Sequence, residues 1–117
     1  MTTDNVVLVG VDGSLESLEA LRWAVQHAAN SGARVHLVCA YSLPSFTAGS
    51  LDGVYAGIDD SAIRAGAQKV IEEAEAIVRE ANVPVTSALE TGDPTGVLVE
   101  LSREASLAVV GTRGGGG

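Results

Sequence analysis

Short apolar runs alternate with longer amphipathic stretches along this chain, and that order restricts its possible folds more than any other feature. The runs at residues 6–11 (VVLVGV), 34–41 (RVHLVCAY) and 107–110 (LAVV) have the length and β-branched content typical of buried strands. A fourth run, at residues 83–90, is more polar and carries Pro84 near its start, which favours a sheet edge. Strands that alternate with helices predict a parallel sheet with right-handed crossovers.

The stretches between these runs carry helix signals. Ser14 or Ser17 can cap a helix that Gly32 ends, and Asp93-Pro94 begins another. Residues 60–82 form the clearest element, because aliphatic residues recur on one face and charged residues occupy the other. That pattern predicts a long helix packed against the core.

Length and composition favour one domain over residues 1–117. The chain is 46% hydrophobic but only 3% aromatic, so its core must be built from Val, Leu, Ile and Ala. Such a core is typical of helices packed closely on a parallel sheet. Residues 42–59 contain glycine, proline and serine without a sustained period, which predicts a functional flap or a mobile segment.

The relative polarity of the strands predicts their order. Residues 6–11 are the most apolar and should be central, whereas residues 83–90 should lie at an edge, which gives the order 3-2-1-4. We therefore expect a doubly wound, Rossmann-like α/β sheet whose winding reverses between the first and fourth strands. The helices that follow those two strands should lie on opposite faces and leave a crevice at the carboxyl ends of the strands.

Two conspicuous loops should flank this crevice. Asp12-Gly13-Ser14 offers a carboxylate suited to ribose hydroxyls, and residues 111–117 offer glycines whose backbone N–H groups can approach a phosphate closely. Each feature alone is also a common structural element, an ordinary turn or a glycine-rich chain end. Their coincidence at one predicted crevice favours a nucleotide site.

Charge and targeting signals exclude several classes of function. The net charge is −8, from 15 acidic and 7 basic residues, so no basic stripe is available for nucleic acid or for an anionic membrane. We expect no signal peptide, because the first residues lack a basic start and a long apolar stretch, and no membrane span, because the apolar runs are too short. Cys39 is the only cysteine, which excludes an intrachain disulfide and fits a reducing compartment. We expect a cytoplasmic protein.

No catalytic or metal-binding set stands out. His27 and His36 have no cysteine or carboxylate at ligand spacing, so no metal site is expected. Ser14 has no visible histidine partner and is better explained as a helix cap. Cys39 lies within an apolar run and is expected to be a buried small hydrophobe, and Trp23 is expected to pack or half-pack on its helix. We expect no dedicated catalytic machinery.

The sequence resembles the universal stress protein family over essentially its whole length. The resemblance is carried by VVLVGVDGSLES, VHLVCAY and ETGDPTGVLVELSREASLAVVGTRGGGG, and its most specific part is the Gly-x-x-Gly pair Gly111 and Gly114. It implies the adenine nucleotide alpha hydrolase-like fold with strand order 3-2-1-4-5. It also implies ATP binding, with or without Mg²⁺, a stress or regulatory role, and a homodimer or tandem domain.

The resemblance further implies a set of nucleotide-binding residues. Asp12 would contact the nucleoside, Gly10 and Val11 would line the base, and the backbone near Ala40 would meet adenine. Val110, Gly111 and Gly114 would flank the ribose and the first phosphates, and Arg113 could add charge there, although a solvent-facing arginine is the simpler reading.

One departure from the family pattern affects these expectations. The ATP-binding members continue past Gly114 to a second glycine and hydroxyl pair that holds phosphates, whereas this sequence stops at Gly117. The sequence also lacks three further features of the family, which are the fifth strand, the last helix and the dimer contact made by the fifth strand. We expect the sequence to be a fragment or the ordered part of a longer protein, rather than a protein that ends here, and we expect phosphate affinity to be weak in the chain as given.

Three other functions compete with nucleotide binding. A scaffold that dimerises or docks partners without a nucleotide is the main alternative, supported by the missing phosphate residues. A phosphorylated receiver domain fails, because it requires an acidic pair after the first strand and an aspartate after the third, where this chain has Asp12-Gly13 and Glu90-Thr91. A flavodoxin is only faintly indicated by Gly13, Ser14 and Ser17, since a flavin usually needs more aromatic side chains than this sequence has.

Overall fold

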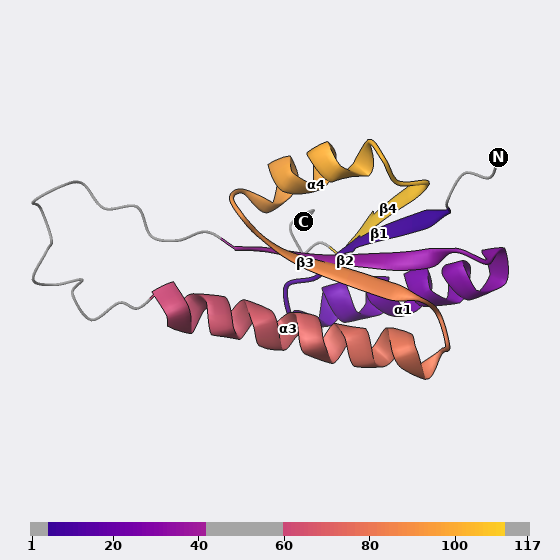
Figure 1. Ribbon diagram of the computed structural model, residues 1–117, viewed down its shortest axis with the longest axis horizontal. Helices are drawn as coiled ribbons and strands as arrows, with labels where there is room; N and C mark the ends of the chain where they lie inside the picture. Colours follow the sequence, from indigo (N-terminus) through magenta and orange to yellow (C-terminus); the bar gives the residue numbers. More distant parts are fainter. Residues whose placement is uncertain (1–4, 42–59, 112–117) are drawn as a thin grey trace, which may run out of the picture.

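The computed structural model describes residues 5–41 and 60–111, and in this part of the chain strands and helices alternate (Figure 1). Their order confirms the expected alternation, and the expected flap at residues 42–59 lies outside the described residues. The elements are β1 (Val6–Gly10), α1 (Leu15–Ser31), β2 (Arg34–Tyr41), α3 (Asp60–Glu80), β3 (Val85–Thr91), α4 (Pro94–Ser102) and β4 (Leu107–Val110).

The described strands form one parallel sheet of four strands in the order β3-β2-β1-β4. β1 is central, with Val9 paired to Leu37 of β2 and to Val109 of β4. The more polar β3 lies at one edge, as Pro84 and its neighbours indicated. The predicted strand order and the reversal between β1 and β4 are confirmed.

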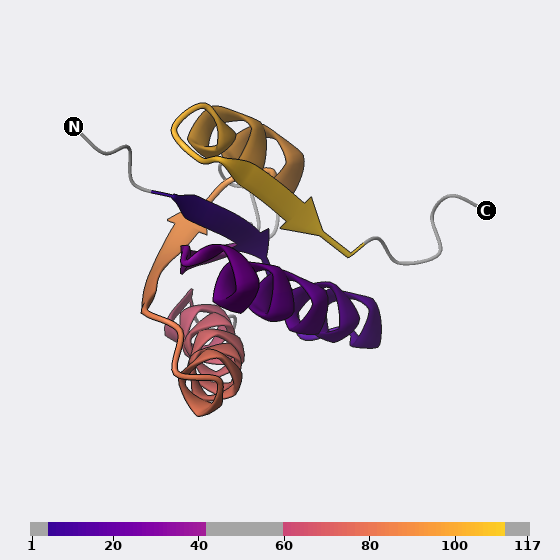
Figure 2. The same cartoon turned by 90° about the vertical axis from the view of Figure 1, so that its right-hand side faces the viewer.

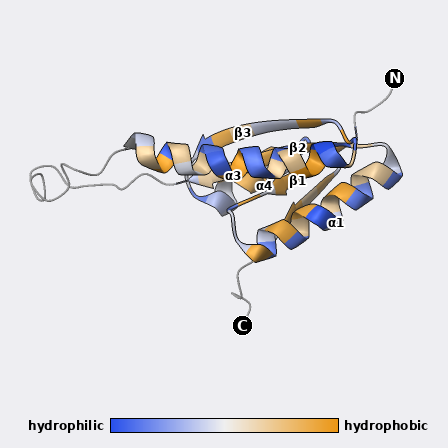
Figure 3. Cartoon of the chain, turned by 90° about the horizontal axis from the view of Figure 1, so that it is seen from below, coloured by the Kyte–Doolittle hydropathy of each residue, from blue (hydrophilic) through white to orange (hydrophobic). Residues whose placement is uncertain are grey.

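The helices cover the two faces of the sheet unequally. α1 and α3 lie on one face and α4 lies on the other, as Figure 2 shows. In Figure 3 both α1 and α3 carry hydrophilic as well as hydrophobic positions. The core lies between these helices and the sheet, and its most buried aliphatic side chains are Val9, Leu21, Val35, Leu37 and Val78. In contrast, α4 has no fully buried residue, so its face of the sheet is more open.

Local chemistry explains where the helices begin and end. Ser14 is the N-cap of α1, and its side chain accepts a hydrogen bond from the Ser17 N–H. Gly32 ends the helix at φ 72°, a left-handed conformation that glycine adopts without strain. Asp93 caps α4 through the Gly96 N–H at 3.0 Å. These residues play the roles that the sequence predicted, and between the two candidate caps the structure selects Ser14.

Several sequence-based expectations are wrong in detail. The sequence pattern places Ala81 on the apolar face of the helix predicted over residues 60–82. In the structure α3 ends at Glu80, because Asn82 takes φ 60°, and Ala81 is exposed. β3 begins after Pro84, whose carbonyl accepts from the Val35 N–H. The expectation for Trp23 is confirmed, because its ring is 55% exposed and stacks on His27 of the same helix.

The helix α4 and strand β4 are more open than their apolar sequences suggested. Val97, Leu98 and Leu101 are only half-buried, and Leu98 borders a cavity between α4 and the sheet. Within the described ranges, no helix is both long enough and apolar enough to cross a lipid bilayer.

Candidate functional site

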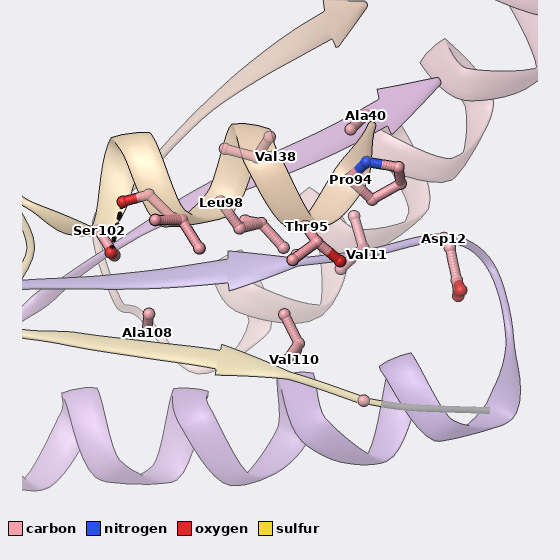
Figure 4. A pocket seen from close by; sticks show the side chains of 13 residues that line it. Val11, Asp12, Val38, Ala40, Pro94, Thr95, Leu98, Ser102, Ala108 and Val110 are labelled. Carbon is pink, nitrogen blue, oxygen red and sulfur yellow. Dashed lines mark hydrogen bonds between the residues drawn. The ribbon is translucent and has the colours of Figure 1, made fainter. Parts of the chain in front are cut away.

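A cavity of about 360 Å³ lies where β1, β2 and β4 end at their carboxyl termini. Figure 4 shows its lining from close by. The loops and strand ends contribute Gly10, Val11, Asp12, Ala40, Val110 and Gly111. This is the crevice that the reversal of winding predicted.

The turn after β1 places a carboxylate at one end of this cavity. The Asp12 Oδ1 atom accepts a hydrogen bond from the Ser14 N–H at 2.8 Å, and the Asp12 N–H donates to the Ser17 Oγ atom at 3.3 Å. Gly13 turns the chain at φ 85° between them. In Figure 4 Asp12 lies apart from the apolar side chains of the lining. One end of the cavity therefore carries the Asp12 carboxylate, and hydrogen bonds to Ser14 and Ser17 hold the turn that bears it.

Gly111 is required by the close approach of β4 to α1. A Cβ atom at this position would collide with the backbone carbonyl of Glu16 and would lie 2.7 Å from the Ser17 nitrogen. The sequence suggested that glycine here serves a phosphate. The described geometry gives a different reason, which is that only glycine lets the end of β4 rest against the first turn of α1.

Gly10 has a similar role on the opposite side. A Cβ atom there would lie 2.7 Å from the Leu98 Cδ1 atom and 3.1 Å from the Val110 Cγ1 atom. The missing side chain therefore leaves room for Leu98 to reach the sheet. The absence of a side chain at Gly10 therefore shapes the floor of the cavity.

The helix α4 supplies a wall that sequence reasoning missed. Its lining residues are Pro94, Thr95, Leu98, Val99 and Ser102. The crossover rule could have found this wall, since a right-handed connection from β3 at one edge to β4 at the other must pass over β2 and β1. That path lies on the face opposite α1. No residue after Gly111 is described, so the expectation of a helix after β4 is not tested, and among the described helices α4 alone covers this face.

The lining is chemically uneven. Val38, Ala40, Leu98 and Val110 give an aliphatic surface, as Figure 4 shows, and Asp12 is the one charged side chain among the described lining residues. Ser102 donates its hydroxyl to the Val99 carbonyl at 2.8 Å, so it already has an acceptor within α4. Such a cavity can accept a flat apolar ring on its floor and a hydroxyl-bearing group at its acidic end.

Among the described residues, Cys39 and His36 have shifted pKa values, and both lie outside the lining. Burial, and secondarily the charge of Asp12, raise the pKa of the Cys39 thiol. Burial lowers the pKa of His36, and the nearby Arg34 lowers it further against an opposing effect of Glu90. The Cys39 side chain is buried in the core, which is the inert role that the sequence indicated. No group of three metal-ligating side chains occurs in residues 5–41 and 60–111.

The structure thus brings together most of the residues singled out in the sequence. Gly10, Val11, Asp12, Ala40, Val110 and Gly111 all line the same cavity. Arg113 and Gly114 lie outside the described residues.

Comparisons with a family model and with known proteins identify the same family. The model of the universal stress protein family matches residues 5–117. A universal stress protein of Mycobacterium tuberculosis is 36% identical over 113 residues, which is 95% of this chain and 36% of that protein. The chain therefore spans about a third of the length of this relative.

Solved structures agree with the fold. A universal stress protein from Burkholderia pseudomallei superposes with a TM-score of 0.75 at 28% identity, covering 96% of this chain and 84% of that one. A universal stress protein solved in complex with cAMP gives a TM-score of 0.68 at 30% identity, covering 93% of this chain and 77% of that one.

Proposed function

The chain belongs to the universal stress protein family, and we propose that it binds an adenine nucleotide in the cavity at the ends of β1, β2 and β4. The observation that carries the proposal is that an acidic turn and a glycine turn meet at one apolar cavity. Nucleotide binding by a relative supports it, because the universal stress protein solved with cAMP is 30% identical to this chain.

Each part of the cavity suits one part of the ligand. The aliphatic surface of Val38, Ala40 and Leu98 would hold the purine, and the backbone of Gly10 and Val11 would border it. The Asp12 carboxylate would accept hydrogen bonds from the ribose hydroxyls, and charge-assisted bonds of this kind are the stronger class. The volume of the cavity, about 360 Å³, is near the lower end for small-molecule sites, which suits a nucleoside.

The finer proposal is that ATP, with Mg²⁺ on its phosphates, is the ligand in the cell. The described residues fit the nucleoside part of this ligand, since they supply an apolar floor and a carboxylate. Val110 and Gly111 would lie beside the ribose and the first phosphate, and Arg113 and Gly114 would extend the contact along the chain. Bound ATP would supply charge and a conformational signal, and this chain's own residues would hold the nucleoside and exclude water from the purine.

We propose binding and regulation rather than catalysis. The one charged group of the described lining is Asp12, and its Oδ1 atom is engaged by the Ser14 N–H. A homodimer or tandem arrangement, a stress-related regulatory role and a cytoplasmic location remain predictions from the sequence and the family.

Isothermal titration of AMP and ATP into the protein tests the proposal. Asp12→Asn should weaken binding by about tenfold, because a neutral amide oxygen accepts a weaker hydrogen bond from the ribose hydroxyls than a carboxylate does. Glu73→Gln is the matched control, because it removes an exposed carboxylate of α3 far from the cavity and should leave binding unchanged. Absence of binding by the native protein, or equal binding by Asp12→Asn, would contradict the proposal.

The alternative is a dimerising scaffold that needs no nucleotide. The observation that favours it is that β4 forms an edge of the described sheet and that its Val110 side chain is 48% exposed. This function predicts a dimer mass by light scattering that AMP does not alter, together with no heat in the titration. A monomer that binds AMP would exclude it.

A further inference from the structure

A buried hydroxyl lies beneath the turn that carries Asp12. Ser17 is 1% exposed, although it belongs to the first turn of a surface helix. Its Oγ atom accepts a hydrogen bond from the Asp12 N–H at 3.3 Å and donates one to the Ser14 carbonyl at 3.2 Å. The hydroxyl therefore connects the end of β1 to the N-cap of α1.

The same helical turn also supports the second loop of the cavity. Gly111 packs so closely on the Glu16 carbonyl and the Ser17 nitrogen that a side chain cannot be accommodated there. Asp12 and Gly111 both line the cavity, from β1 and from β4. Both loops are therefore held against one turn of α1, with Ser17 at the point where they meet.

Helix stability alone does not explain a serine at this position. Ser14 already provides the capping oxygen, and it receives the Ser17 N–H at 3.1 Å. Alanine at a position inside a helix is more favourable than serine by intrinsic propensity. What alanine could not supply at position 17 is the acceptor for the Asp12 N–H in this partly buried hydrogen bond.

We propose that Ser17 is a positioning residue for the nucleotide site, which fixes the backbone of Asp12 and so sets the spacing between the Asp12 turn and Gly111. This inference rests on the proposed function, because it assigns Ser17 a role in binding without contact to the ligand. Loss of the hydroxyl releases the Asp12 turn, and the carboxylate no longer stays at the position that the ribose hydroxyls require.

The experiment compares Ser17→Ala, Ser17→Thr and Ser14→Ala with the native protein. Hydrogen exchange at the Asp12 amide, measured by NMR without ligand, reports how strongly the Ser17 hydroxyl restrains the Asp12 turn. Calorimetric titration with AMP reports the consequence for binding. Ser14→Ala is the matched control, since it removes the capping oxygen of the same helix but keeps the Ser17 hydroxyl and the Ser14 carbonyl.

We expect Ser17→Ala to exchange the Asp12 amide about tenfold faster and to bind AMP about tenfold more weakly, as the loss of one partly buried hydrogen bond predicts. Ser17→Thr retains the hydroxyl and should restore both values to near those of the native protein. Ser14→Ala should lower the melting temperature but change neither value appreciably. A Ser17→Ala protein that behaves as native, or a Ser14→Ala protein that loses as much binding, would overturn the inference.

The two readouts separate this inference from the proposed function. If the native protein does not bind AMP, the proposed function fails. The exchange measurement then still decides whether Ser17 holds the Asp12 turn: faster exchange only in Ser17→Ala supports the positional role, and unchanged exchange refutes it.

Discussion

Replacing Gly111 by alanine gives the sharpest test of how the two loops meet. The added Cβ would collide with the Glu16 carbonyl and lie 2.7 Å from the Ser17 nitrogen, and both atoms belong to the backbone of α1. Ordinary contacts to carbon need about 3.5 Å or more, so the end of β4 must move from the helix by roughly 1 Å. Side-chain rotation cannot relieve this clash, because neither atom belongs to a side chain.

We expect Gly111→Ala to lower the free energy of unfolding by about 1–3 kcal/mol, the usual cost of overpacking. Each kcal/mol corresponds to roughly 4–8 °C in Tm for a domain near this size. The variant should also bind AMP more weakly, because the shifted residue lines the cavity. Thermal unfolding followed by circular dichroism, with and without AMP, measures both effects.

Gly66→Ala is the matched control for this substitution. Gly66 lies inside α3, and a Cβ atom there would meet no other atom within 4 Å. The same chemical change should therefore raise stability by about 0.5–1 kcal/mol, since alanine is the better helix residue. A Gly111→Ala protein that is as stable as the native protein, or that gains stability as Gly66→Ala does, would refute the close packing of β4 on α1.

Three further predictions address other parts of the molecule. Gly10→Ala should cost about 1–3 kcal/mol in the native background but less in Leu98→Ala, because its Cβ meets the Leu98 side chain; equal costs in urea unfolding would contradict that contact. The lowered pKa of His36 means that the unfolded chain binds a proton more readily, so the stability that this residue contributes is present above about pH 6.5 and is lost as the pH falls through its folded pKa. Urea unfolding between about pH 7.5 and 5.5 should therefore show a smaller pH dependence in His36→Gln, and identical slopes would count against the shift. Cys39 should react with a thiol reagent only after denaturation, because it is 5% exposed and burial raises its pKa, and fast reaction of the native protein would place it elsewhere.

The strand order and the position of the cavity could be predicted from the sequence because both follow from a few local patterns. The apolar run of β1 and the polar β3 with Pro84 before it determine which strand is central and which lies at an edge. The turns at Asp12 and Gly111 then come together at the point of reversal. Strand order and the meeting of the two turns follow from burial and chain direction, and both of these can be predicted from short stretches of sequence.

The features that sequence reasoning missed depend on contacts between distant segments. The lining by Leu98 follows from the path of α4 across the sheet, and the need for Gly111 follows from its approach to Glu16 and Ser17 of α1. The sequence placed Ser17 only as a possible cap, whereas its buried hydroxyl receives the Asp12 amide. No local pattern identifies such pairs.

The most direct test of the central claim is a titration of the ¹⁵N-labelled protein with AMP, followed by NMR at each amide. Binding in the cavity at the strand ends predicts that the largest shifts fall on Gly10, Asp12, Ala40 and Gly111, with little change along α3. A spectrum that AMP leaves unchanged, or shifts confined to residues away from these strand ends, would contradict it.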